Sequence, residues 1–194
     1  MTPTGRECMA ERTSALAGHF SPELRGKPGE PGVSLSEVSD LTLWQIAAWP
    51  ETLAEISQTI ENQIGASEAP GPGRCASGTR GAALRIEPLK WWLLDTPAPS
   101  VAADLGVTLD LSHSRTRIRI AGCDAAACLS RLLPLDLREA EFSLGDVASS
   151  SIHHVGVTLA RGPESYDLFV PRGFALSIWE LLLETAEQFG AEVL

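Results

Sequence analysis

The stretch of sequence that decides the fold is DLSHSRTRIRIAGCDAAACLSRLLPLDLR, residues 110–138. Residues 115–120 alternate arginine with threonine or isoleucine, and a period of two is typical of a strand with one polar and one apolar face. After Gly122 the apolar residues recur every three to four positions, which predicts a short helix that ends before Pro134. The stretch therefore predicts a strand followed by a helix, and it contains no catalytic motif.

The chain upstream reads as a series of short elements that lead into this stretch. Pro50 suits the first turn of a helix because its missing N–H has no partner there, and Gly65 is a typical helix stop. The predicted elements are a strand over 41–47, a helix over 50–64, a surface loop over 65–81, strands over 82–86 and 90–94, a short helix over 96–105 and a strand over 107–111.

Downstream, a strand region over 147–160 and a strand over 166–170 flank a Gly-Pro turn, so we expect an antiparallel pair. A helix over 174–189 follows. The order strand, helix, paired strands, helix thus occurs twice, in halves of about 41–111 and 112–194. This repeat predicts an α+β fold made of two ferredoxin-like split βαβ halves.

Residues 1–40 contain too many prolines and glycines for a helix or a central strand. We interpret them as an extended N-terminal arm, separate from a domain over residues 41–194. Such an arm either lies along a partner and orders on binding, or is a free terminus. Its isolated apolar residues are the candidate anchors: Leu16, Phe20, Val33 and Leu35.

The composition limits the possible partners. The 194 residues carry 15 Lys and Arg against 25 Asp and Glu, a net charge of -10 with a pI near 4.8. This balance argues against a nucleic-acid backbone or an anionic membrane as the main partner. No apolar run approaches the roughly 20 residues that span a bilayer, and the first 20 residues show no apolar leader, so we expect a cytoplasmic protein. The four cysteines match no zinc or disulfide spacing, and we interpret them as reduced thiols.

The histidines are the first candidates for chemistry. His153 and His154 are adjacent, and neighbours on a strand point to opposite faces, so they cannot easily share a metal ion. His113 lies between Ser112 and Ser114, but no acid is placed to orient its ring, so we interpret this triplet as a turn. Because the sequence has no dinucleotide fingerprint, metal cluster or triad, we expect no catalytic, cofactor-binding or metal-binding residue in this chain.

Some residues indicate subunit contacts instead. Arg115, Arg117 and Arg119 form a stripe that receives carboxylates from a partner or from this chain, or else faces solvent. Of the adjacent Trp91 and Trp92, one should face a core and the other an interface, unless a helix or loop covers both.

The C-terminal helix is apolar on two sides. Its second side, centred on Trp179 and Leu183, meets either the second half-domain or a partner, and we favour the partner. The candidate interface residues are therefore Trp179, Leu183, Leu176, Arg115, Arg117, Arg119 and Trp91.

A set of motifs carries a family resemblance. They are LWQIAAWPETL (43–53), RIEPLKWWLL (85–94), DLSHSRTRIRIAG (110–122), LLPLDLR (132–138), and SSIHHVGVTL with YDLFVPRGFALSIWELL (150–182). With these motifs in this order, the chain resembles the gamma subunits of heterotetrameric sarcosine oxidases. It is also similar to the small subunits of related N-methyl amino acid dehydrogenases, such as those acting on N-methylglutamate.

The resemblance implies a folate-binding, aminomethyltransferase-like fold over residues 41–194, in a non-catalytic subunit that holds no cofactor and acts in assembly and stabilisation. It implies alpha, beta and delta subunits as partners, which carry FAD, FMN, NAD, tetrahydrofolate and zinc. Such a complex oxidatively demethylates sarcosine to glycine with O2 and tetrahydrofolate, giving H2O2 and 5,10-methylenetetrahydrofolate or formaldehyde.

One departure separates the chain from the transferase. That enzyme needs an acidic residue at its folate pocket, and the strand over 155–160 carries none. The departure argues against an independent folate site. Two other hypotheses stay open at this point: a stand-alone folate-dependent transferase, and a scaffold unrelated to amine oxidation.

Overall fold

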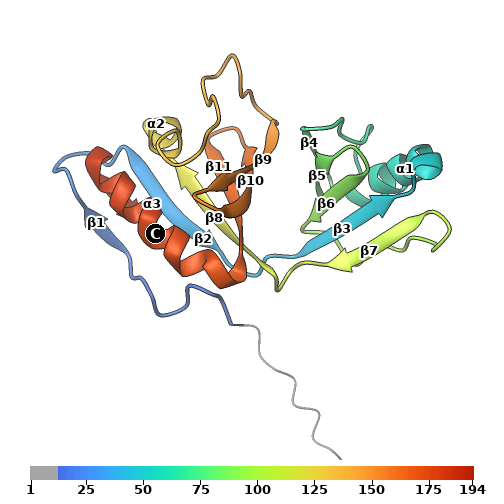
Figure 1. The fold of residues 1–194 in the computed structure, drawn as a ribbon, viewed down its shortest axis with the longest axis horizontal. Helices are drawn as coiled ribbons and strands as arrows, with labels where there is room; N and C mark the ends of the chain where they lie inside the picture. Colours follow the sequence, from blue (N-terminus) through green and yellow to red (C-terminus); the bar gives the residue numbers. More distant parts are fainter. Residues whose placement is uncertain (1–12) are drawn as a thin grey trace, which may run out of the picture.

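The computed structural model describes residues 13–194, which form two mixed α/β units packed side by side (Figure 1). A sheet of five strands occupies residues 43–110, and a sheet of seven strands uses segments from both ends of the described chain. The first sheet has the order β4-β5-β6-β3-β7 and the second has the order β1-β12-β2-β8-β11-β10-β9. The α+β fold class predicted from the element order is confirmed.

The first unit contains the predicted strand, helix and paired strands, but it has an additional strand, β4, and no helix follows the pair. A short 3₁₀ turn at Pro50–Thr52 leads into α1, and Gly65 ends α1 in the left-handed conformation with a φ of 71°. Ile56, Ile60 and Ile64 point from α1 into a core against one face of the sheet. The elements are β3 (Leu43–Ala48), α1 (Leu53–Ile64), β4 (Cys75–Gly78), β5 (Gly81–Glu87), β6 (Lys90–Leu94) and β7 (Gly106–Asp110).

The second unit repeats this order with two helices on one face of its sheet. Its elements are β8 (Arg115–Ala121), α2 (Ala125–Leu129), β9 (Val147–Ile152), β10 (Val155–Arg161), β11 (Ser165–Pro171), α3 (Ala175–Ala186) and β12 (Ala191–Val193). Strands β10 and β11 form the predicted antiparallel pair. The helix predicted after Gly122 is only the five residues of α2, and a 3₁₀ turn, Glu187–Phe189, extends α3 to Gly190.

The described part of the N-terminal arm differs from the expectation. Glu23–Arg25 forms β1, and Val33–Val38 forms β2, which lies between β12 and β8 with Val33 and Leu35 fully buried. In a ferredoxin-like half the last strand would pair with the first, so β2 occupies the place of β12 and displaces it by one position. Gly122 makes this possible, because a Cβ at that residue would lie 2.3 Å from the carbonyl oxygen of Gly32. Residues 1–12 of the predicted arm lie outside the described residues.

Residues 13–22 cover the second side of α3. Figure 1 shows this blue segment running alongside the red helix, and the ring of Phe20 lies 4.5 Å from that of Trp179. Leu16 is fully buried in the same core. The expectation that a partner subunit covers this side of the helix is therefore corrected: the arm of the same chain covers it.

Three further expectations differ from the structure. Residues 96–105, predicted as a helix, contain no helix, because Pro97 and Pro99 each remove a backbone donor and restrict the residue before them. The predicted loop over 65–81 contains β4. The strand region over 147–160 is a hairpin, β9 and β10, with His153 and His154 in its turn.

Candidate functional site

The arginine stripe lies on the face of β8 that looks toward the first sheet. The other face of β8 carries Thr116, Ile118 and Ile120, which pack under α2 and α3. The guanidinium of Arg115 lies 5.7 Å from the ring centre of Trp92, which belongs to β6 of the first sheet. The stripe thus belongs to a junction between the two units, and the reading of it as a solvated outer face is corrected.

A carboxylate of the same chain holds two of the three arginines. Asp167 lies directly opposite Arg119 in the β8–β11 pairing. Its oxygens accept hydrogen bonds from Arg117 at 2.6 Å and from Arg119 at 3.0 and 3.3 Å. Arg117 also lies 3.6 Å from the carboxylate of Asp95, in the segment that follows β6. The charge of these arginines is therefore matched within the chain, which leaves little for a partner to neutralise.

Arg115 differs from its two neighbours because none of residues 13–194 places a carboxylate on it. Its guanidinium donates to the backbone oxygen of Ser114 at 3.2 Å and borders a hollow of about 270 Å³ between the first sheet and the β9–β10 hairpin. Burial lowers the pKa of Arg115 from its ordinary value. Gln45 on the floor of the hollow accepts a hydrogen bond from the indole N–H of Trp92 at 3.2 Å.

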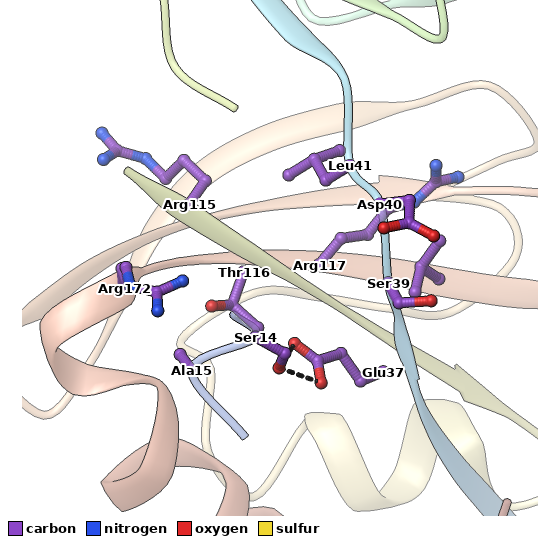
Figure 2. A pocket seen from close by; sticks show the side chains of 11 residues that line it. Ser14, Ala15, Glu37, Ser39, Asp40, Leu41, Arg115, Thr116, Arg117 and Arg172 are labelled. Atoms are coloured by element: carbon purple, nitrogen blue, oxygen red, sulfur yellow. Dashed lines mark hydrogen bonds between the residues drawn. The ribbon is translucent and has the colours of Figure 1, made fainter. Parts of the chain in front are cut away.

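A second hollow, of about 220 Å³, lies at the start of β8, where the N-terminal segment meets the connection after β2 (Figure 2). Figure 2 shows the Ser14 hydroxyl turned toward the Glu37 carboxylate, to which it donates a hydrogen bond. Arg172 donates to the backbone oxygen of Thr13 at 2.6 Å. These contacts join residues 13–22, the covering segment of α3, to the second unit.

A third hollow, also about 220 Å³, opens beyond Arg117 and Arg119 and includes Cys75. Burial is the main cause that raises the pKa of the Cys75 thiol, and Arg74 only partly offsets it. A raised pKa keeps the sulfur as a thiol, which is a poor nucleophile. Cys8, the fourth cysteine, lies outside the described residues, and burial raises the pKa of Cys128 to about 11.

The histidines and serines occupy turns. His153 has a φ of 51° at the tip of the β9–β10 hairpin, where both His153 and His154 are exposed. Ser112 donates to the backbone oxygen of Leu43 and accepts from its N–H, and Ser114 donates to the backbone oxygen of Leu111. The interpretation of residues 112–114 as a turn is confirmed.

The apolar members of the candidate interface are buried in this chain. Trp91 and Trp179 are 0% and 1% exposed, and Leu183 is 6% exposed. Trp91 packs under α1, whereas Trp92 packs edge to face on Phe169 at 5.6 Å, in the core between the sheets. Both tryptophans are covered by the chain itself, so Trp91, Trp179 and Leu183 are corrected from interface to core residues.

The remaining candidates are partly covered. Leu176 lies half-buried against the core of the second unit, and Arg117 is the most buried arginine of the stripe. Arg119 keeps 43% of its side-chain surface exposed. Of the predicted interface residues, the stripe alone reaches the junction.

A second ion pair joins the two units, between the residue before β4 and the residue before β9. The carboxylate of Asp146 pairs with Arg74, and a backbone bridge joins the same two residues. Although burial opposes it, the pKa of Asp146 is lowered by hydrogen bonds from the backbone N–H and hydroxyl of Ser143 and from Arg74.

Asp146→Asn is expected to reduce the free energy of unfolding by about 1 kcal/mol near neutral pH, because it weakens these bonds at a partly exposed site. Because the folded pKa of Asp146 is lowered, its contribution is present above the unfolded pKa of about 4 and disappears as the pH falls through the folded value. Urea unfolding at pH 7 and pH 3 measures the difference, which should be smaller at pH 3. An equal loss at both pH values would contradict this assignment.

Asp167 and Asp95 were not predicted from the sequence. Asp167 sits at a junction-facing position of β11, between Tyr166 and Leu168, which pack in the core under the helices. The sequence did contain a signal for Asp167. It is a single acid on a strand of alternating character, and a neighbouring strand carries the arginine stripe. Only the strand register, which the sequence did not supply, placed Asp167 opposite Arg119.

No protein-family model matches the chain. Sarcosine oxidase subunit gamma from Corynebacterium sp. (strain U-96) is 27% identical to it over 173 residues, which span 84% of this chain and 83% of that subunit. The chain is thus similar to sarcosine oxidase subunit gamma over most of its length. The structure of heterotetrameric sarcosine oxidase from Corynebacterium sp. U-96 in complex with pyrrole 2-carboxylate contains a chain that matches this one with a TM-score of 0.69 at 24% identity. The match covers 85% of this chain and 88% of that chain.

The fold is shared more widely. Glycine cleavage system aminomethyltransferase T from Bartonella henselae matches this chain with a TM-score of 0.59 at 15% identity, over 84% of this chain and 48% of that one. The chain thus spans about half the length of the transferase. Together the two likenesses confirm the predicted folate-binding, aminomethyltransferase-like fold. Among the helices of residues 13–194, none has the length and apolarity to cross a membrane.

Proposed function

We propose that this chain is the gamma subunit of a heterotetrameric sarcosine oxidase, and that it acts in the assembly and stability of the complex rather than in its chemistry. The observation that carries the proposal is the match to a gamma subunit over 84% of this chain and 83% of the relative.

The proposed reaction is that of the complex. It oxidatively demethylates sarcosine to glycine with O2 and tetrahydrofolate, giving H2O2 and 5,10-methylenetetrahydrofolate or formaldehyde. Alpha, beta and delta subunits are the proposed partners, and they are proposed to carry FAD, FMN, NAD, tetrahydrofolate and zinc. A cytoplasmic location is part of the same proposal.

The geometry of the junction supports a structural role. The carboxylate of Asp167 is engaged by Arg117 and Arg119, and the Asp146 carboxylate is engaged by Arg74 and Ser143. Arg117, Arg119 and Asp167 all belong to the second unit, and the pairs that join the two units are Arg117 with Asp95 and Arg74 with Asp146. A group that is fully engaged in ion pairs is not poised to take a proton from a substrate.

The proposal is tested by expressing the tagged chain alone and together with the alpha, beta and delta subunits. The chain alone should show no flavin absorbance and no sarcosine-dependent H2O2 production, whereas the co-expressed sample should contain flavin-bearing subunits in stoichiometric amount. Omission of the tagged chain should lower the yield of assembled oxidase.

Specific outcomes would overturn the proposal. A stoichiometric flavin peak in the isolated chain, or tetrahydrofolate binding by the isolated chain, would indicate a stand-alone enzyme. A complex that turns over N-methylglutamate but not sarcosine would assign the chain to the related dehydrogenases.

A further inference from the structure

We propose that the free edge of β7 is a strand-addition site, at which an extended segment of another subunit pairs with Gly106–Asp110. The inference rests on the proposed function, because it names the surface through which the chain joins a complex. An exposed strand edge is a ready template for pairing with a second chain.

The outermost strands of the described sheets are β1, β9, β4 and β7, and three of them are protected. Strand β1 has three residues and two charged side chains, and β9 carries serines at 149–151. The edge of β4 is capped by backbone bonds from Cys75 N–H to Gly145 oxygen at 2.7 Å and from Val147 N–H to Gly73 oxygen at 2.8 Å. Strand β7, with the sequence GVTLD, has no lysine and no proline, its one charged residue, Asp110, stands at its end, and no strand or cap of the described residues covers its open edge.

The pairing of β7 with β3 leaves a backbone donor and acceptor facing outward. The N–H of Leu111 donates to Leu43, and the oxygen of Leu105 accepts from Trp49, so the odd-numbered residues of this stretch bond toward β3. In an antiparallel pair the intervening residues point the other way. The N–H and C=O of Thr108 therefore face the open edge, where the described chain supplies no further strand.

The side chains on either side of Thr108 are apolar and exposed. Val107 is 51% exposed and Leu109 is 52% exposed. Both lie on the face opposite α1, since their cross-strand neighbours Ala47 and Gln45 alternate with Ile46 of the α1 core. Gln45 borders the hollow at Arg115. Val107 and Leu109 therefore lie on the same face of the first sheet as that hollow, on the strand next to it.

The charge around β7 favours another subunit over a second copy of this chain. Asp104 precedes the strand, and Glu51 lies beside it, because Thr52 donates a hydrogen bond to the oxygen of Leu105. Both acids are exposed, and the chain carries a net charge of -10, so two copies would bring like charges together. The segment that fits has apolar residues at alternate positions and a lysine or arginine where it passes Glu51 and Asp104.

The test uses the tagged chain co-expressed with the alpha, beta and delta subunits. Thr108→Pro removes the outward N–H while leaving the bonds to β3 intact, and the pair Val107→Lys with Leu109→Lys removes the apolar face. Each is expected to lower the recovery of partner subunits about tenfold or more, the scale of losing a hot-spot contact. The matched control is Leu24→Lys, because Leu24 is 70% exposed on the outermost strand β1, and this variant should keep wild-type recovery.

Hydrogen exchange supplies a measurement that does not depend on a substitution. The Thr108 amide should exchange quickly in the free chain and be protected in the assembled complex. If circular dichroism shows that Thr108→Pro does not fold, the strand-addition site is tested by the double lysine variant and by the exchange rate of the Thr108 amide.

Wild-type recovery of partners by both β7 variants, with no protection of Thr108, would refute the strand-addition site while leaving the proposed function standing. Failure of the wild-type chain to recover any of the three subunits would refute the proposed function and the site with it. A homodimer in sedimentation equilibrium that Thr108→Pro abolishes would show that a second copy occupies the edge, which also refutes the proposal.

Discussion

Asp167→Ala is expected to lower the free energy of unfolding by about 3–5 kcal/mol, because it leaves a buried guanidinium without its counter-ion. The side chain of Arg117 is 11% exposed, and its main carboxylate partner is Asp167 at 2.6 Å. Asp95 lies farther, at 3.6 Å, with 63% of its side chain exposed, so solvent screens it. Among residues 13–194 the Nε of Arg117 has no hydrogen-bond partner, which makes the guanidinium still more dependent on Asp167.

Urea unfolding followed by circular dichroism measures the effect. The matched variant Asp95→Ala should cost less than about 1 kcal/mol, as expected for an exposed ion pair. Arg117→Met combined with Asp167→Ala should recover much of the lost stability, because an apolar side chain replaces the unpaired charge. A loss below about 1 kcal/mol for Asp167→Ala alone would show that the pair does not stabilise the junction.

Trp179→Ala is expected to destabilise the chain by about 3–5 kcal/mol, the usual range for removing a buried aromatic side chain. Trp179 is 1% exposed and packs against residues 13–22, with the ring of Phe20 at 4.5 Å and tilted by 33°. The same burial means that Trp179→Glu with Leu183→Glu should unfold the isolated chain rather than detach a partner. A charge at either buried position would be desolvated among apolar neighbours.

Thermal unfolding of the isolated chain checks this second expectation. Phe174→Ala serves as the control, since Phe174 precedes the same helix but is 51% exposed, and it should change stability by less than about 0.5 kcal/mol. The destabilisation by Phe20→Ala should lie between those of Trp179→Ala and Phe174→Ala, because Phe20 is partly buried. If the Trp179→Glu and Leu183→Glu variant stays folded, the second side of α3 is not a core surface.

The local patterns in the sequence located most of the elements because each pattern is decided by near neighbours. The period of two in residues 115–120 reflects a strand whose faces meet different surroundings, and β8 has that character. Pro50 and Gly65 delimit the first helix through backbone chemistry alone. Where prolines crowded a short segment, as in residues 96–105, the helix pattern was wrong.

Long-range pairing could not be read from the same patterns. Residues 33–38 look like part of a breaker-rich arm, yet their alternation of buried and half-buried side chains suits an inner strand once β8 and β12 flank it. The second apolar side of α3 was identified correctly, but the sequence could not show that Leu16 and Phe20 cover it. The arginine stripe was found, whereas its counter-ion became visible only with the register of β11.

The position of β2 also sets the order in which the chain can fold as it is synthesised. Strand β2 ends at Val38, but its antiparallel neighbour β8 ends at Ala121, which is 121 minus 38, or 83 residues later. At roughly 5–20 residues per second, ribosomes need about 4–17 s to make that interval. The strands of the first sheet lie within these residues, so that sheet can form before β8 and β12, the two neighbours of β2, have been synthesised. The nascent chain therefore exposes Val33 and Leu35 of the unpaired β2 ahead of a folded unit, and the parallel partner β12 is made last of all the described strands.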